Sequence, residues 1–260
     1  MFPSPEASIY SMSPILAFLA RTFPGIRISV SRLEKIKTAS WCKYDDVLFP
    51  FVSRFMDRKR FVAMAAGAIE YDEVAIAKQV ISKDDILVEF GAGLGIAAAR
   101  VHKLCTPKGH ICFEANPLLG EYTSQLFKLN NLNICFENVA LGNGQTLPFH
   151  AMDDYILSAF DKPAEGQAFT RIEVATITLD AVIKAHQPTV IFCDIEGAEL
   201  DYFTSDQFEG VKKIVIELHP EIYGKHGLSA FCARMQKQGF ALKQKQRQTY
   251  CFVRQKPDKA

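Results

Sequence analysis

The chain has 260 residues, 48% of them hydrophobic, which is enough for one large α/β domain. Its 30 basic and 29 acidic residues give a formal net charge of +1, so the composition gives no reason to expect a nucleic-acid partner or an anionic membrane surface. Its seven cysteines form no C-x-x-C pair, which is typical of reduced core thiols and predicts a cytoplasmic protein.

The N-terminal quarter of the chain carries no readable motif. The apolar stretch at residues 14–20 is too short to span a bilayer and follows no basic segment, so we expect a short helix, no secretory signal and no stable membrane insertion. We divide the chain into an N-terminal extension at residues 1–66 and a main domain at residues 67–260. The extension is a candidate lid or acceptor-binding segment.

The main domain begins with a helix, a strand, a glycine-rich turn and a second helix. Apolar residues recur at helical spacing over residues 72–81, and an apolar run at 86–89 predicts a strand. Three glycines then occupy every second position, and the alanine-rich stretch at 95–104 has high helix propensity. Glycines at such a turn let the backbone approach a ligand, and the helix start directs free N–H groups at it.

Downstream of this turn, apolar strands alternate with helices. The predicted strands cover residues 110–114, 134–136, 171–177, 190–194 and 214–217, the helices cover 118–129, 179–186 and 229–238, and a terminal hairpin pairs 240–244 with 249–254. A tight turn at 142–144 predicts that residues 147–150 return as a hairpin strand, and residues 153–170 form an irregular loop. The alternation predicts right-handed crossovers and a mainly parallel sheet.

Four of the predicted strands end in an acidic residue: Glu89, Glu114, Asp194 and Glu217. Ligands of open α/β sheets bind outside the carboxyl ends of the strands, so we expect these acids to gather along one crevice.

The turn separates two classes of nucleotide ligand. A hydride-transferring Rossmann enzyme uses G-x-G-x-x-G, whose third glycine would fall on Ile96, whereas this turn reads G-x-G-x-G. Glu89 beside the turn favours a cationic ligand over a pyrophosphate, and S-adenosylmethionine carries an ammonium, a positive sulfur and no phosphate. Glu114 is placed to accept hydrogen bonds from ribose hydroxyls, a role that both cofactors share.

Several motifs occur in one order along the second half of the chain. They are D-x-E-G-x-E at 194–199, T-L-D at 178–180, an E-A-N-P similar to E-P-N-P at 114–117, and E-x-H at 217–219. With them the chain resembles the FkbM-type S-adenosylmethionine-dependent methyltransferases over residues 67–210, and more weakly to residue 219.

The chain departs from this family's pattern at three positions. In the first glycine motif, Glu89 replaces an aspartate and Gly93 an asparagine, which keeps a carboxylate and a flexible turn. Phe192 stands where the family often has a lysine. If that lysine contacts the acceptor in relatives, a different acceptor is expected here.

The resemblance implies a Rossmann-like class I methyltransferase fold: a seven-stranded, mostly parallel sheet with helices on both faces and a C-terminal antiparallel hairpin. It implies transfer of a methyl group from S-adenosylmethionine to a hydroxyl of a sugar, natural product or similar small molecule. The expected cofactor-binding residues are Glu89, Gly91, Ala92, Gly93, Gly95, Glu114, Ala115, Asn116, Asn138 and Asp194.

The predicted catalytic residues are Asp194, Glu196 and His219. Asp194 and His219 are the candidates for the base that takes the hydroxyl proton, and histidine is better matched to neutral pH. Asp194, Glu196 and Glu217 could instead hold Mg²⁺ that binds the acceptor's hydroxyls. For Glu199 we expect a role at the start of the following helix.

Two other functional classes stay open from the sequence. A nicotinamide-dependent oxidoreductase would bind the dinucleotide and is disfavoured by Ile96. A non-catalytic binding protein could retain the methyltransferase fold. Methylation of a base amine is disfavoured because no N-P-P-Y or D-P-P-Y turn follows the strand at 190–194.

Overall fold

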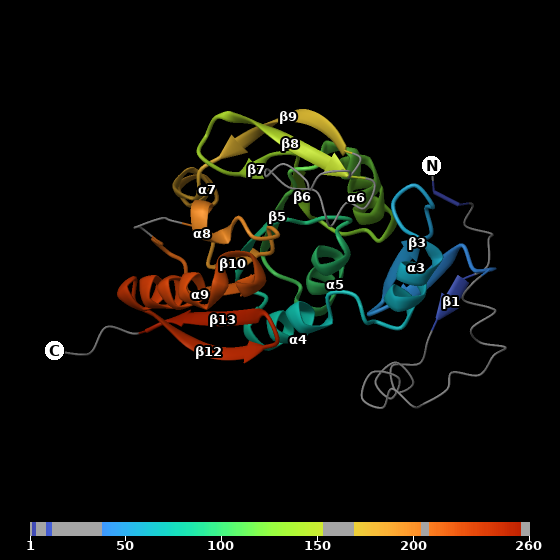
Figure 1. The fold of residues 1–260 in the computed structure, drawn as a ribbon. Coiled ribbons are helices and arrows are strands. Elements are labelled where there is room, and N and C mark those ends of the chain that lie inside the picture. The colour runs from blue at the N-terminus through green and yellow to red at the C-terminus, as the bar shows by residue number, and fades with distance from the viewer. Residues whose placement is uncertain (1, 4–8, 12–37, 153–168, 204–207, 256–260) are drawn as a thin grey trace.

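The computed structural model describes residues 2–3, 9–11, 38–152, 169–203 and 208–255, arranged as an α/β fold around a central sheet (Figure 1). The central sheet has seven strands in the order β12-β13-β11-β10-β4-β5-β6. Its strands are β4 (Ile86–Phe90), β5 (Gly109–Phe113), β6 (Cys135–Glu137), β10 (Val190–Cys193), β11 (Lys213–Glu217), β12 (Phe240–Gln246) and β13 (Thr249–Arg254).

The direction of the strands confirms the predicted fold class. β4, β5, β6, β10 and β11 pair in parallel, whereas β13 pairs antiparallel with both β11 and β12. β13 is therefore the single reversed strand of the sheet, and it lies between β11 and β12. This is the seven-stranded class I methyltransferase arrangement, with the expected C-terminal hairpin.

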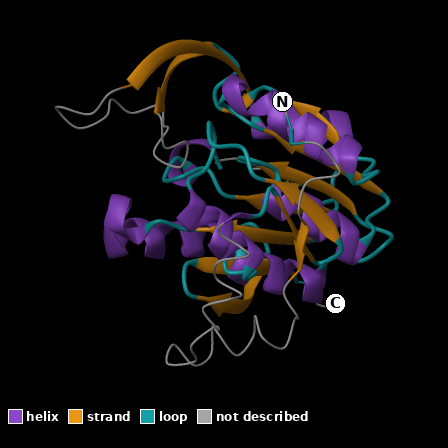
Figure 2. Cartoon of the chain, turned by 90° about the vertical axis from the view of Figure 1, so that its right-hand side faces the viewer, coloured by secondary structure: helices purple, strands orange, loops and turns teal. Residues whose placement is uncertain are grey.

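Helices cover both faces of the central sheet (Figure 2). The helices are α4 (Tyr71–Val80), α5 (Ile96–Cys105), α6 (Pro117–Leu129), α7 (Leu179–His186), α8 (Glu199–Tyr202) and α9 (Pro220–Lys237). Buried side chains of α4, α5 and α6 pack on one face, and those of α7 and α9 pack on the other. The alternating strands and helices thus bury apolar surface on both faces, as parallel sheets require.

Local signals set the helix starts. Asn116 caps α6 by accepting a hydrogen bond from the Leu118 N–H, and Pro117 occupies the first turn. Thr178 caps α7 through the Ala181 N–H, as expected. α9 begins at Pro220 instead of residue 229, because a non-helical Gly224 joins two helical segments that the apolar pattern did not connect.

Residues 142–152 differ from the predicted hairpin. β8 (Thr146–Met152) pairs antiparallel with β9 (Phe169–Ile177), which in turn pairs in parallel with the short β7 (Ala140–Leu141). β8 thus pairs with the strand that follows it, because β7 is too short to provide a ladder and β9 matches β8 over seven residue pairs. These strands form a separate sheet above the carboxyl ends of β5 and β6 (Figure 1). Most of the predicted loop at residues 153–170 lies outside the described residues.

The described part of the N-terminal region packs on the main domain. It contributes β1 (Ile9–Ser11), β2 (Trp41–Tyr44), β3 (Val47–Pro50) and α3 (Arg58–Ala65), and Phe49 and Phe61 share a hydrophobic cluster with α5 and α6. Asn130 at the end of α6 donates to the Leu48 carbonyl and accepts from the Leu48 N–H. The regular elements at 41–65 were not predicted, and the predicted helix at 14–20 lies outside the described residues.

All seven cysteines lie in the described residues and are free thiols. Cys135 is exposed, unlike the other cysteines in strand-like runs. Among the described helices, none combines the length and apolar character that crossing a bilayer requires.

Candidate functional site

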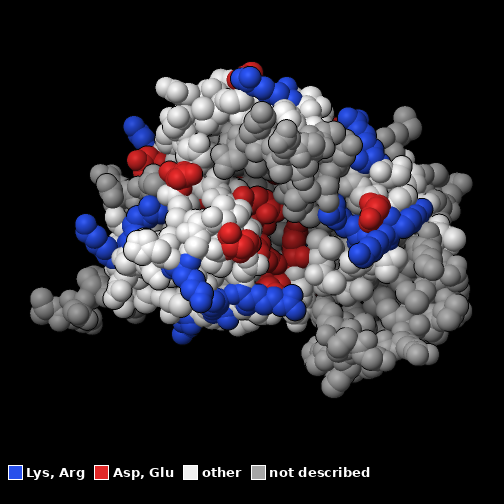
Figure 3. Space-filling model, viewed as in Figure 1, with Lys and Arg blue, Asp and Glu red and all other residues white. Residues whose placement is uncertain are grey.

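A cavity of about 630 Å³ opens at the carboxyl ends of β4, β5, β10 and β11, within the size range of small-ligand pockets. Acidic side chains gather in the hollow at the centre of the molecule (Figure 3). The acidic residues lining it are Glu70, Asp72, Glu73, Glu114, Asp194, Glu196, Asp201 and Glu217, and the apolar ones include Phe113, Leu119, Val139, Leu141 and Phe149.

The glycine turn forms the floor of the cavity and contacts two neighbouring strands. The N–H groups of Gly91 and Ala92 donate to the Phe113 carbonyl at 2.9 and 3.1 Å. Gly91 has a φ of +80°, and a Cβ at this position would lie 1.6 Å from the Asp194 carbonyl oxygen. The first glycine is therefore required for the close approach between this turn and the start of the D-x-E-G segment.

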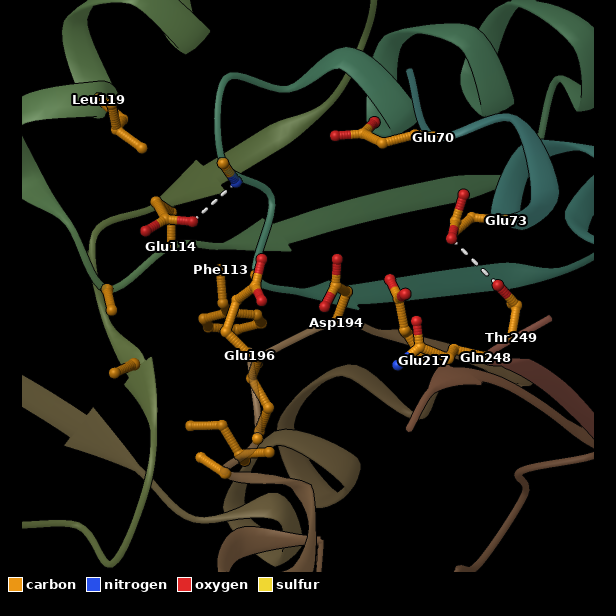
Figure 4. Close-up of a pocket in the computed structure, with 18 of the residues that line it drawn as sticks. Glu70, Glu73, Phe113, Glu114, Leu119, Asp194, Glu196, Glu217, Gln248 and Thr249 are labelled. Carbon is orange, nitrogen blue, oxygen red and sulfur yellow. Dashed lines mark hydrogen bonds between the residues drawn. The ribbon is translucent and has the colours of Figure 1, made fainter. Parts of the chain in front are cut away.

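Glu114 lies directly after β5 with both carboxylate oxygens held by backbone N–H groups. Oε2 accepts from Gly93 at 2.7 Å and Oε1 accepts from Asn116 at 2.7 Å (Figure 4). Burial raises the pKa of this carboxyl, and the two N–H groups act in the opposite direction. The carboxylate thus joins the glycine turn to the α6 start and keeps free lone pairs for a ligand.

Asp194 directly follows β10, and Glu217 is the last residue of β11. The carboxyl groups of both residues point into the cavity (Figure 4). One carboxylate oxygen of each residue lies within 4.8 Å of the other. Burial raises the pKa of Glu217 to about 7 and that of Asp194 well above its ordinary value, and neighbouring carboxylates add to both shifts. Each carboxyl group therefore disfavours the charged form of the other.

His219 lies two residues beyond β11 and contacts two carboxylates of the D-x-E-G-x-E segment. Its Nδ1 is 3.1 Å from Glu199 Oε1, and its Nε2 is 3.5 Å from Glu196 Oε2. Burial alone would lower the pKa of His219, but the bond to Glu199 and the charges of Glu196 and Glu217 outweigh it and raise the pKa. Glu199 is fully buried and also accepts from the Gly197 N–H, so it fixes the orientation of the imidazole.

Glu70 and Glu73 line the wall opposite the Asp194–Glu217 pair (Figure 4). Glu70 has a left-handed backbone, and its carboxyl lies near the Ala97 N–H at the start of α5. Burial and the charges of Glu73 and Glu89 raise the pKa of Glu70 to about 8, and its Oε2 is buried without a hydrogen-bond partner in the described structure. Glu73 accepts a hydrogen bond from Thr249 at 3.0 Å.

Glu89 does not join the other strand-end acids, which corrects the expected crevice of four. Its side chain leaves β4 on the face that α5 covers, where it contacts His110 Nε2 at 3.0 Å and Cys112 Sγ at 3.8 Å. It is 1% exposed, and burial raises its pKa to about 8. Because β4 continues to Phe90, Glu89 lies within the strand and takes the alternate face. Its predicted contact with a cofactor is not supported by this position.

The other predicted binding residues divide between lining and supporting positions. Gly91, Gly93 and Ala115 line the cavity. Four others, Ala92, Gly95, Asn116 and Asn138, are not among its lining residues. Asn138 donates to the Glu114 carbonyl at 3.0 Å and packs against Gly120, so it supports the β5 end instead of facing a ligand.

Sequence reasoning missed Glu70, Glu73 and Thr249. The two glutamates flank the predicted helix start near residue 72, where acids are common because of the helix dipole. That signal gives no indication that the start of α4 faces the start of α5 across the cavity. Thr249 begins a terminal strand and carried no motif.

The chain was compared with known proteins. Residues 89–242, more than half of the chain, match the Methyltransferase FkbM domain. Among solved structures, M. jannaschii TYW2 in complex with AdoMet is 17% identical, covering 82% of this chain and 84% of that chain with a TM-score of 0.43. Precorrin-6y C5,15-methyltransferase from Geobacter metallireducens GS-15 is 13% identical, covering 72% of this chain and 88% of that chain with a TM-score of 0.42. Curated protein sequences gave no match.

The FkbM domain match contains the glycine turn, Glu114, the D-x-E-G-x-E segment and His219. The chain therefore belongs to the FkbM methyltransferase family.

Proposed function

We propose that the protein transfers the methyl group of S-adenosylmethionine to a hydroxyl of a small molecule such as a sugar or natural product. The observation that carries this proposal is the cavity lined by Glu114 and Glu196, because the buried His219–Glu199 pair lies directly behind Glu196. Family membership supports the methyltransferase class. The oxygen acceptor is the proposed part.

The residues of the cavity fit S-adenosylmethionine. Glu114 would hold the ribose hydroxyls, and Phe113, Leu119 and Val139 provide apolar surface for the adenine. The buried Oε2 of Glu70 has no hydrogen-bond partner among the described residues. An ammonium group supplies donors for such an acceptor. When bound, the cofactor supplies a methyl group already activated by the positive sulfur.

The start of α5 disfavours the nicotinamide alternative. A dinucleotide would place its pyrophosphate at the N-terminus of this helix, where free N–H groups attract anions. Here the Glu70 carboxyl lies near the Ala97 N–H, at the place where a pyrophosphate would bind. Glu70 thus disfavours a pyrophosphate at this helix start, which is the role that the sequence analysis gave to Glu89.

His219 is the proposed base. With the cofactor bound, His219 Nε2 would accept the hydroxyl proton as the acceptor's oxygen bonds the methyl carbon and the carbon–sulfur bond breaks, with its electron pair staying on sulfur. Glu199 holds Nδ1 and stabilises the imidazolium that forms. Asp194 is the weaker candidate for this role, because a free carboxylate is a weak base for a hydroxyl and histidine is better matched to neutral pH.

Calorimetry with the purified full chain tests cofactor binding, and a methyl-transfer screen over sugars and hydroxylated metabolites tests the acceptor class. We expect binding of S-adenosylmethionine or its demethylated product at millimolar concentration or below, and an O-methylated product. Binding of a nicotinamide dinucleotide without binding of S-adenosylmethionine would contradict the proposal. Cofactor binding with no transfer, together with unchanged cellular activity of the Asp194→Ala variant, would instead support a non-catalytic binding protein.

A further inference from the structure

The Asp194–Glu217 pair has an unusual arrangement for two acids. β10 and β11 are parallel neighbours, so their carboxyl ends bring both side chains to one point at the edge of the sheet. One oxygen of each carboxyl group lies within 4.8 Å of the other. Two like charges at this separation repel, and a cation between their oxygens would offset that repulsion.

A second observation points to a ligand at this pair. The Oδ1 atom of Asp194 is buried in the cavity wall and has no hydrogen-bond partner in the described residues, although buried carboxylate oxygens are usually satisfied. A ring nitrogen of His219 and one carboxylate oxygen from each acid all lie within 4.8 Å of one another. Oxygen donors therefore converge on one volume of the cavity, next to a candidate proton acceptor.

We propose that Asp194 and Glu217 bind a divalent cation, Mg²⁺ or Mn²⁺, between their carboxylate oxygens. This inference rests on the proposed function. Mg²⁺ is commonly held by one or two carboxylates and keeps its other positions for water and substrate oxygens, which this open cavity allows.

The donor set differs from the one expected from the sequence. Glu196 has a left-handed backbone and directs its Oε2 toward His219 Nε2 at 3.5 Å, so it is not counted among the metal ligands. Glu73, the next carboxyl along the wall, accepts a hydrogen bond from Thr249. The cation site thus consists of the Asp194–Glu217 pair, with His219 beside it.

The site defines a class of acceptor. A cation with free adjacent positions binds two neighbouring oxygens, so the acceptor carries a vicinal diol or an equivalent pair of oxygens. Coordination makes the bound hydroxyl more acidic. Its proton moves to His219 Nε2, its oxygen bonds the methyl carbon, and the carbon–sulfur electron pair remains on sulfur.

Mn²⁺ titration followed by electron paramagnetic resonance tests the site directly, because bound Mn²⁺ loses the signal of the free ion. The samples are the full-length wild type, Asp194→Asn, Glu217→Gln and the control Glu73→Gln, which removes another carboxylate of the same cavity. We expect one Mn²⁺ per wild-type chain, affinity at least about tenfold lower in the two ligand variants, and a change of less than about twofold in Glu73→Gln.

Binding of S-adenosylhomocysteine, measured on the same samples, separates this inference from the proposed function and checks that each variant is folded. Wild-type protein that binds S-adenosylhomocysteine but no Mn²⁺ at millimolar concentration overturns the cation site and leaves the proposed function standing. Equal Mn²⁺ affinity in wild type and Glu217→Gln overturns it as well. Wild-type protein that binds neither ligand contradicts the proposed function itself.

Discussion

Glu114 combines two features in one carboxylate, because it holds the Gly93 and Asn116 N–H groups and lines the cavity. In Glu114→Gln, the amide NH₂ would face the N–H of Gly93 or Asn116. The side chain would also lose an oxygen that could accept a hydrogen bond from the ribose hydroxyls. We expect S-adenosylhomocysteine to bind at least about tenfold more weakly by calorimetry. Glu121→Gln on the exposed face of α6 is the matched control and should bind as wild type does. Equal affinity in both variants would remove Glu114 from the cofactor site.

His219 and Glu199 are expected to affect turnover more than cofactor binding. For His219→Gln we expect kcat to fall by about 100-fold or more, because the acceptor proton loses its base. For Glu199→Gln, a positioning change, we expect kcat to fall by about tenfold with KM nearly unchanged, because one buried hydrogen bond to the imidazole is weakened. The measurement is steady-state kinetics with an acceptor from the screen. A rise in KM at constant kcat in both variants would assign them to substrate binding.

At the scale of elements, the contact between the glycine turn and the D-x-E-G segment fixes the geometry of the cavity. Gly91→Ala would place a methyl group against the Asp194 carbonyl at a φ of +80°. We expect a loss of about 3 kcal/mol or more in the free energy of unfolding, measured with urea. The control is Gly109→Ala, whose Cβ would meet its nearest neighbour at 3.6 Å, and it should change stability by less than about 0.5 kcal/mol. Similar losses in both variants would contradict this explanation.

Helices and strands with a regular pattern of apolar residues were predictable from the sequence. The site residues at the ends of these strands were predictable for the same reason. Apolar runs followed by an acid identified β4, β5, β10 and β11, and hence Glu114, Asp194 and Glu217 at one edge. The side-chain face of Glu89 could not be deduced, because an apolar run does not reveal which residue is the last of its strand. One residue of difference reverses the face.

Contacts between distant elements were not predictable. The position of Glu70 depends on how α4 packs on α5, and the pairing of Glu199 with His219 depends on where α9 begins. In both cases the local signal was an acid at a helix start, whose ordinary explanation is the helix dipole. The β2–β3 pair was missed because each of these strands has only four residues.

For the whole molecule, Asp85 connects three parts of the chain at the amino-terminal edge of the sheet. Its carboxylate accepts from Lys213 at 2.7 Å, from Thr189 at 2.8 Å and from the Ser82 N–H at 2.7 Å. Burial opposes ionisation of Asp85, but these bonds outweigh it and lower its pKa to about 2. Because the folded pKa is below the unfolded value, the stabilisation is complete above about pH 4 and is lost as the pH falls toward 2.

We expect Asp85→Asn to lower the free energy of unfolding by about 2 kcal/mol at pH 7, and by about half as much at pH 3. Urea unfolding at the two pH values provides the measurement. Asp84→Asn, at the exposed neighbouring position, should have little effect at either pH. A loss for Asp85→Asn that does not shrink at pH 3 would show that the carboxylate charge is not what stabilises the fold.

The acid-rich wall of the cavity has a consequence for the order of events in a catalytic cycle. Under the proposed reaction, the methyl donor enters with a positive sulfur and leaves as a neutral thioether. The acidic side chains that line the cavity remain after transfer, so the attraction between wall and ligand decreases with the chemical step. The same carboxylates that retain the charged donor therefore hold the spent product less strongly, and the loss of one charge promotes its exchange for a fresh molecule.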